Sequence, residues 1–104
     1  MTKKDITNKI AELRKFGYKV FTFQNNRKMR IPIAGVTDYL IIGHGKIMFV
    51  ESKLISTKDK LNNDQIEFKR EVEKVKSDDV LYFIVNEENV NWFVDNFIEE
   101  SFVD

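Results

Sequence analysis

Apolar residues recur along this chain with two different periods, one typical of helices and one typical of strands. Ile6, Ile10 and Leu13 share one face of a helix, and Gly17 follows at a position where glycine commonly ends one. Alternation of apolar and polar residues in the segment YKVFTF predicts a strand. The full pattern predicts helices over residues 5–16, 61–76 and 86–97 and strands over residues 18–23, 36–42, 47–53 and 79–85.

Two of these strands are expected to form a hairpin, because VTDYLII and IMFVESK flank the glycine-containing segment GHGK. His44, the only histidine, falls in that segment and is interpreted as a turn residue rather than a catalytic one. The strand over residues 79–85 is apolar on both faces, so we expect it to be central. The order αβββαβα predicts one α/β domain over residues 1–104, a mixed sheet flanked by helices.

Composition narrows the class of protein. Hydrophobic residues make up 42% of the chain, enough for one core, and the absence of cysteine excludes disulfide bonds and cysteine-ligated zinc. The longest apolar run, VLYFIV, is too short to span a bilayer, and the N-terminal residues lack a signal-peptide pattern. We therefore expect a cytoplasmic protein without a membrane partner.

The formal net charge of zero hides an asymmetry. Residues 1–30 carry nine basic and two acidic side chains, whereas residues 87–104 carry six acidic side chains and no Lys or Arg. Such an asymmetry is typical of a protein with one face toward a polyanion, although ordinary solvated charge is the alternative. The candidate phosphate-binding residues lie on or before the first helix (Lys3, Lys4, Lys9, Arg14 and Lys15) and in the loop that leads to Asp38 (Arg27, Lys28 and Arg30).

Two carboxylates interrupt apolar rows of the predicted hairpin. Pairing around the turn, with partner numbers that sum to about 88, places Asp38 within reach of Glu51. Two carboxylates at a core edge cost free energy unless a cation lies between them, and Mg²⁺ prefers such oxygen ligands. Lys53, one pleat beyond Glu51, could stabilise charge on a phosphate. A turn at Asp38 and an exposed ion pair between Glu51 and Lys53 are the structural alternatives.

Gln65 falls on the apolar stripe of the helix predicted over residues 61–76. An amide on a core-facing row needs hydrogen-bond partners, and facing the carboxylates it could orient a water or Lys53. The alternative is a capping box with Asn62, because Asn-x-x-Gln fits that pattern.

The segments GVTDYLIIGHGKIMFVESK and LNNDQIEF together resemble the VRR-NUC family, the virus-type replication-repair nucleases of the PD-(D/E)XK nuclease superfamily. The resemblance spans about residues 6 to 98. Its signature combines Gly-x-x-Asp entering a strand, Glu-x-Lys ending the next strand, and Gln near the start of the following helix. The matching residues here are Gly35, Asp38, Glu51, Lys53 and Gln65.

The resemblance implies a restriction-endonuclease-like fold and a Mg²⁺- or Mn²⁺-dependent endonuclease that hydrolyses DNA phosphodiester bonds. It implies that Asp38, Glu51 and the backbone carbonyl of Ser52 bind the metal. Lys53 would position or polarise the attacking water, and Gln65 would support the site.

Two further points follow from the resemblance. Many members carry a glutamate on the first helix near the metal, and Glu12 is the candidate here, with a solvated helix face as the alternative. The family often has proline immediately before the aspartate, where this chain has Thr37.

Small phage-type members of the family stand alone, so we expect a protein of a bacterial or phage-infected cell. No segment resembles a base-reading helix, which favours recognition of DNA structure, such as junctions, flaps or forks. A homodimer is expected, so that two strands can be cut. Candidate contact residues are Phe97, Ile98, Phe102 and Val103. The alternative function is a non-catalytic nucleic-acid-binding module with a nuclease-like fold.

Overall fold

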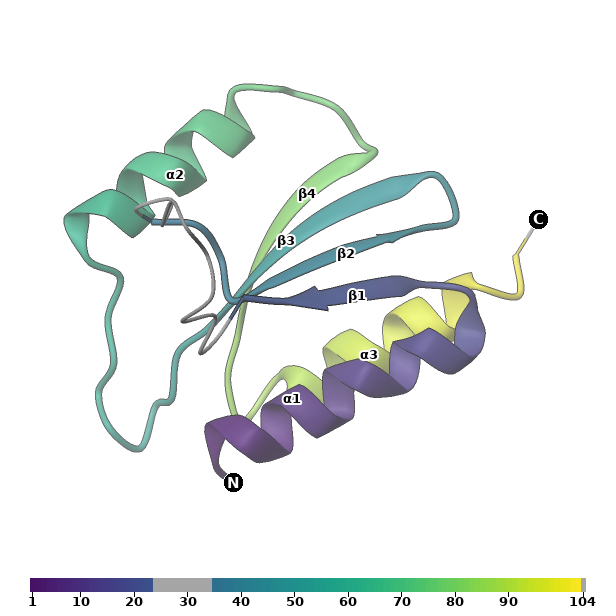
Figure 1. The fold of residues 1–104 in the computed structure, drawn as a ribbon, viewed down its shortest axis with the longest axis horizontal. Helices are drawn as coiled ribbons and strands as arrows, with labels where there is room; N and C mark the ends of the chain where they lie inside the picture. Colours follow the sequence, from purple (N-terminus) through teal and green to yellow (C-terminus); the bar gives the residue numbers. More distant parts are fainter. Residues whose placement is uncertain (24–34, 104) are drawn as a thin grey trace.

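A mixed four-stranded sheet with helices on both faces forms the architecture, which the computed structural model describes for residues 1–23 and 35–103 (Figure 1). Its elements are α1 (Lys3–Ala11), the 3-10 helix η1 (Glu12–Phe16), β1 (Lys19–Thr22), β2 (Tyr39–Gly43), β3 (Lys46–Ser52), α2 (Asn63–Glu73), β4 (Val80–Val85) and α3 (Val90–Glu100). The strand order is β1-β2-β3-β4; the first two pairs are antiparallel and β3 pairs with β4 in parallel. The predicted α/β class and the predicted order of elements are confirmed.

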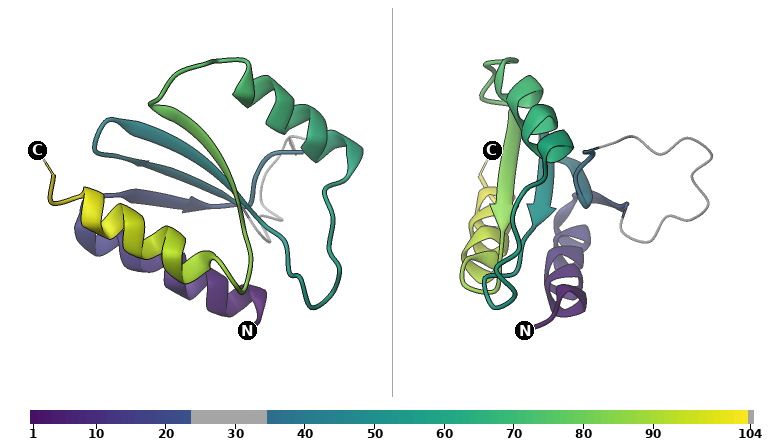
Figure 2. Two further views of the ribbon diagram at one scale, coloured as in Figure 1. Left: turned by 180° about the vertical axis from the view of Figure 1, so that it is seen from behind. Right: turned by 90° about the vertical axis from the view of Figure 1, so that its left-hand side faces the viewer.

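The main core lies between one face of the sheet and helices α1 and α3, which run side by side beneath it (Figure 2). The predicted stripe of the first helix is confirmed, because Ile6, Ile10 and Leu13 are fully buried. Phe83 of β4 packs edge-on against Phe93 and Phe97 of α3, with ring centroids 5.0 and 5.6 Å apart. Aromatic side chains therefore fasten α3 to the sheet.

Helix α2 lies on the opposite side of the sheet from α1 and α3, nearest to β4 (Figure 1). The rings of Phe49 and Phe68 meet edge-on at 5.4 Å, which fixes the helix against the middle of β3. Because side chains alternate along a strand, Glu51 shares this face with Phe49. The end of β3 therefore presents Glu51 toward the start of α2.

The prediction that the strand over residues 79–85 is central is wrong, since β4 is an outer strand of the described sheet. Its apolar residues on both faces are explained by helices on both faces: α3 packs on one and α2 on the other. Apolar residues on a strand face indicate that the face is covered, but they do not indicate whether the strand is central or outer in the sheet.

The hairpin has the predicted tight turn. His44 and Gly45 both have positive φ angles, 51° and 77°, as the two central residues of a type I′ turn require. His44 is therefore a turn residue, as predicted, at the hairpin end opposite Asp38 and Glu51. Its Nε2 atom lies 2.7 Å from the carbonyl oxygen of Phe16. Tyr39 pairs with Val50, so the register extended by one residue places Asp38 across from Glu51.

Side-chain caps explain where two helices differ from their predicted bounds. Helix α1 begins at Lys3 because Thr2 and Asp5 form a capping box with hydrogen bonds of 2.7 and 3.2 Å. Helix α3 begins only at Val90, because Asn86 and Asn89 bind each other's backbone N–H groups in a preceding turn. Because of these caps, the first helix starts earlier than predicted and α3 starts later.

The C-terminal aromatic residues differ in their surroundings. Phe97 is buried in the main core, so its prediction as a dimer contact is corrected, whereas Phe102 is 74% exposed. Trp92 is also exposed, and it belongs to no core. Within the described parts of the chain, no helix has the length and apolar character needed to cross a membrane.

Candidate active site

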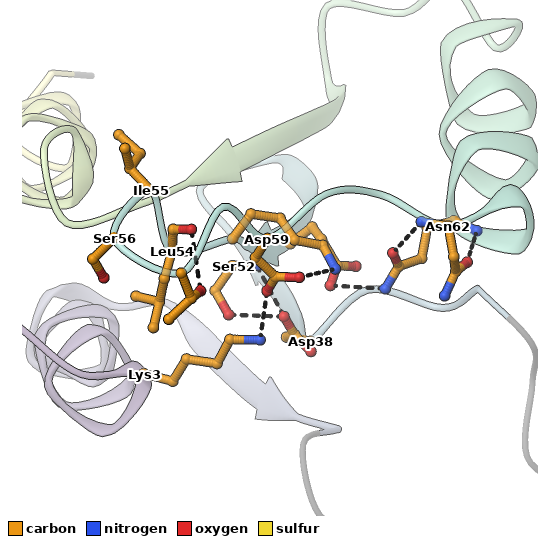
Figure 3. Close-up of polar contacts among 12 residues, drawn as sticks. Lys3, Asp38, Ser52, Leu54, Ile55, Ser56, Asp59 and Asn62 are labelled. Carbon is orange, nitrogen blue, oxygen red and sulfur yellow. Dashed lines mark hydrogen bonds and ion pairs between the residues drawn. The ribbon is translucent and has the colours of Figure 1, made fainter.

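The start of β2 lies beside the end of β3, which brings the Asp38 carboxylate to the backbone of Ser52, next to Glu51, as the hairpin pattern predicts. The Asp38 Oδ2 atom accepts hydrogen bonds from the Ser52 N–H group at 2.9 Å and from the Ser52 hydroxyl at 2.8 Å (Figure 3). Ser52 is itself fully buried. A carboxylate held by two donors of one buried residue has a fixed position and orientation.

Glu51 is a buried carboxyl group with an incomplete set of partners. It is 1% exposed, and among the described residues its Oε2 atom has no hydrogen-bond partner. Burial, followed by the adjacent Asp38, raises the pKa of Glu51 to about 8, although Lys53 and Lys3 oppose the shift. Without a cation, this carboxyl group is therefore mainly protonated at neutral pH.

Gln65 closes the capping box that was the structural alternative, and it also contacts Glu51. Its backbone N–H and side-chain oxygen exchange hydrogen bonds of 2.9 Å with Asn62, which closes a capping box at the start of α2. Its Nε2 atom also donates to the Glu51 Oε1 atom, at 3.3 Å. The capping box holds the amide oxygen of Gln65, which orients the amide nitrogen toward Glu51.

Gly35, three residues before Asp38, lies in close contact with the start of α2. It has a φ angle of 80°, and a Cβ atom there would collide with the carbonyl oxygen of Asp64. Only glycine accommodates both the backbone conformation and the close approach. Thr37 stands where the family often has proline. Its buried hydroxyl donates to the Tyr39 carbonyl at 2.9 Å, so the polar side chain has a hydrogen-bond partner.

Lys53 lies at the same end of β3, with its side chain 13% exposed, and it pairs with Asp59 rather than with Glu51. Its Nζ atom is 3.6 Å from the Asp59 Oδ1 atom, and the predicted alternative of an exposed Glu51–Lys53 pair is not formed. Lys3 of α1 reaches the other oxygen of Asp59, at 3.2 Å (Figure 3). Asp59 did not belong to the predicted site, because no spacing along the chain relates it to Glu51. Lys3 was expected among the phosphate-binding residues of the N-terminal third, but its position beside Asp59 was not predicted.

Glu87 holds the loop that follows β3. Its carboxylate accepts hydrogen bonds from the Ile55 N–H at 2.6 Å, the Ser56 N–H at 3.2 Å and the Ser56 hydroxyl at 2.8 Å. Its own N–H group, and then that of Ile55, lower the pKa of Glu87 to about 2. Glu87 precedes α3, so this clamp ties the loop that carries Asp59 to a distant part of the chain.

Tyr82 of β4 is a further buried polar group near the carboxylates. Its hydroxyl has no hydrogen-bond partner within the described ranges. Burial, followed by the charges of Glu51 and Asp38, raises the pKa of Tyr82 to about 12. The hydroxyl is therefore neutral at physiological pH and retains its proton.

The remaining predicted residues are not brought to the carboxylates. Glu12 begins η1 and pairs with Lys9 at 3.2 Å, and its side chain is 46% exposed. It follows Lys3 by nine residues, about 14 Å along the helix. Arg14 donates to the Val20 carbonyl at 2.8 Å. The candidate phosphate-binding residues of the loop, Arg27, Lys28 and Arg30, lie outside the described residues.

The chemistry of the site fits a small divalent cation. No group of three or more His, Cys, Asp or Glu side chains suited to a metal occurs in residues 1–23 and 35–103. Mg²⁺, however, commonly uses only one or two carboxylates and takes its remaining ligands from water and substrate phosphate. The unpartnered Glu51 Oε2 atom, next to a second carboxylate, offers an oxygen that a cation would satisfy.

Gln65→Glu tests the two roles of Gln65 separately. Glutamate can still close the capping box, so we expect helix α2 to remain, but it cannot donate to the Glu51 Oε1 atom and adds a third carboxylate. We expect a free energy of unfolding about 2–3 kcal/mol lower in the absence of metal, because a donor is lost and a carboxylate is added beside a buried carboxyl group. Thermal unfolding in EDTA measures the change. Asn62→Ala, which removes only the cap, should cost about 1 kcal/mol; an equal loss in both variants would contradict a role beside Glu51.

Comparison with family models, with curated proteins and with solved structures gave no match to this chain.

Proposed function

We propose that the protein is a Mg²⁺- or Mn²⁺-dependent endonuclease of DNA, with a restriction-endonuclease-like fold of the VRR-NUC type. The observation that supports this most is the carboxylate pair at the end of β3. Asp38 and the fully buried Glu51 lie together, one Glu51 oxygen has no partner, and Lys53 follows at the same strand end. A fully buried carboxyl group with an unpartnered oxygen costs free energy, and such groups cluster at functional sites.

Asp38, Glu51 and the backbone carbonyl of Ser52 are the proposed metal ligands. When bound, the ion would supply Lewis acidity that activates water and neutralises charge on the scissile phosphate. The buried position of Glu51 explains why a cation is needed there, because both carboxylates are then ionised without mutual repulsion.

The surrounding side chains orient these groups. Ser52 holds Asp38 through two hydrogen bonds, and Gln65 holds the Glu51 Oε1 atom. The Lys53 ammonium, 13% exposed, offers positive charge to a phosphate that becomes more negative during attack. Each of these contacts acts before the substrate arrives, so the site is preorganised.

The proposed substrate is branched or otherwise structured DNA. Contacts from basic residues to the DNA backbone carry no sequence information, so the proposed recognition rests on the shape of the DNA. RNA has the same backbone charge, so it is an arm of the test below. The proposed homodimer retains Phe102 and Val103 as exposed candidates, 74% and 72% exposed.

The test is cleavage of labelled substrates by the wild type and by Lys53→Ala. Linear duplex, single strand, flap, fork and four-way junction, in DNA and RNA, are incubated with Mg²⁺ or Mn²⁺. We expect metal-dependent products that Lys53→Ala reduces on the order of 10²–10³-fold. Lys46→Ala is the matched control, because Lys46 lies at the opposite end of β3 and pairs with Glu100. Binding without products under both metals would instead support the non-catalytic binding module.

A further inference from the structure

We propose that Lys3 is a second phosphate-binding lysine of this site, and that Asp59 is a positioning residue that holds Lys3 and Lys53 beside the carboxylates. The inference rests on the proposed nuclease function and extends it to two residues outside the family's signature. It starts from one geometric fact, the sharing of a single carboxylate by two lysines from distant parts of the chain.

The first turn of α1 is anchored to the site strand. The Thr7 hydroxyl donates to the Lys3 carbonyl at 3.0 Å and lies 2.6 Å from the Tyr39 hydroxyl. Tyr39 directly follows Asp38 and is fully buried, as is Ile6 of the same turn. The backbone of Lys3 is therefore held in place relative to Asp38.

Asp59 is held independently of the lysines. Its N–H group donates to the Leu54 carbonyl at 3.1 Å, and the loop between them is clamped by Glu87. Partial burial opposes ionisation of Asp59, but the hydrogen bond and charge of Lys3, with those of Lys53, outweigh it and lower its pKa. Asp59 is thus a fixed anion that pairs with two flexible side chains, Lys53 and Lys3, and Figure 3 labels the pair with Lys3.

The charge count favours a role in binding a polyanion. One carboxylate neutralises one ammonium, so the Lys3–Asp59–Lys53 cluster keeps one positive charge beside Glu51. A structural ion pair needs only one lysine and contributes little at a surface. The charge of Lys3 also opposes the raised pKa of Glu51, so it acts on that carboxyl group. A phosphate bound at the carboxylates would meet both ammonium groups.

The binding arm of the test compares Lys3→Gln with Lys46→Gln. Both variants remove one lysine that pairs with one carboxylate, but Lys46 pairs with Glu100 at the other end of β3, at 3.8 Å. Affinity for a labelled DNA fork is measured in EDTA over a range of KCl concentrations. We expect Lys3→Gln to reduce the slope of log K against log salt by about one unit and Lys46→Gln to leave it unchanged. Equal slopes in the two variants would overturn the assignment of Lys3.

The kinetic arm examines Asp59→Asn, with Glu100→Gln as control. Asparagine keeps the shape of the side chain but releases the lysines and removes a negative charge. We expect a KM equal to or lower than that of the wild type and a kcat lower on the order of 10- to 100-fold, at an unchanged Tm. Glu100→Gln should change neither constant. An unchanged kcat in Asp59→Asn, or a loss of kcat that follows a loss of Tm, would overturn the positioning role.

The two arms separate this inference from the proposed function. If the wild type cleaves and Lys53→Ala does not, but Lys3→Gln matches Lys46→Gln, the nuclease stands and the inference fails. If the wild type cleaves nothing with either metal, the proposed function fails, and the salt slope alone decides whether Lys3 binds phosphate.

Discussion

Glu51→Gln is expected to abolish metal-dependent cleavage and at the same time to stabilise the metal-free protein above neutral pH. Glutamine occupies the same volume and can still accept from Gln65, but it has no charge with which to bind a cation. Opposite effects on activity and stability are the signature of a residue kept for chemistry rather than for folding.

The pH dependence of this effect follows from the raised pKa. Glu51 titrates near 8 in the folded protein against a reference of 4.5, so between these values the folded state binds more protons than the unfolded state. The wild type therefore loses stability as pH rises through this window, and Glu51→Gln does not. The difference is absent below pH 4.5 and is expected to reach a few kcal/mol above pH 8.

Thermal unfolding in EDTA, at one pH below 4.5 and one above 8, measures the difference. For a domain of this size, each kcal/mol corresponds to roughly 4–8 °C in Tm. Saturating Mg²⁺ should then raise the Tm of the wild type and leave that of Glu51→Gln unchanged, because only the wild type binds the ion. A lower Tm for Glu51→Gln than for the wild type in alkaline EDTA would make Glu51 a structural residue.

Gly35→Ala is expected to lower both the free energy of unfolding and the rate of cleavage. Alanine at a φ angle of 80° costs about 1–2 kcal/mol in backbone strain alone. Its Cβ atom would also collide with the carbonyl oxygen of Asp64, a backbone atom in the first turn of α2. Relief of the collision requires the start of α2 to shift, which draws Gln65 away from Glu51.

Gly45→Ala is the matched control for this prediction. Gly45 has nearly the same φ angle, 77°, but a Cβ atom there meets nothing within 4 Å. Both variants therefore carry the strain, and only Gly35→Ala carries the collision. We expect Gly45→Ala to retain cleavage with a modest loss of Tm, and Gly35→Ala to lose about 2 kcal/mol or more together with activity. Equal losses of Tm and activity would show that the contact with α2 is unimportant.

Local patterns in the sequence were sufficient to predict the elements and the central pair of carboxylates. Helical and strand periods are properties of neighbouring residues, and the buried Ile6, Ile10 and Leu13 confirm the first helix. The proximity of Asp38 and Glu51 was predictable because a tight turn sets the register of a hairpin over a short distance. Gln65 was predictable for the same reason, since both of its contacts follow from a cap and an apolar stripe.

Tertiary structure alone decided what surrounds that pair. Asp59 and Lys3 are 56 residues apart in the sequence, and Glu87 binds a loop 31 residues before it, so no local spacing marks either contact. The outer position of β4 was equally hidden, because helices on both faces produce the apolar pattern of a central strand. A sequence states which side chains require burial or a partner; the packing of distant elements determines which groups meet that requirement.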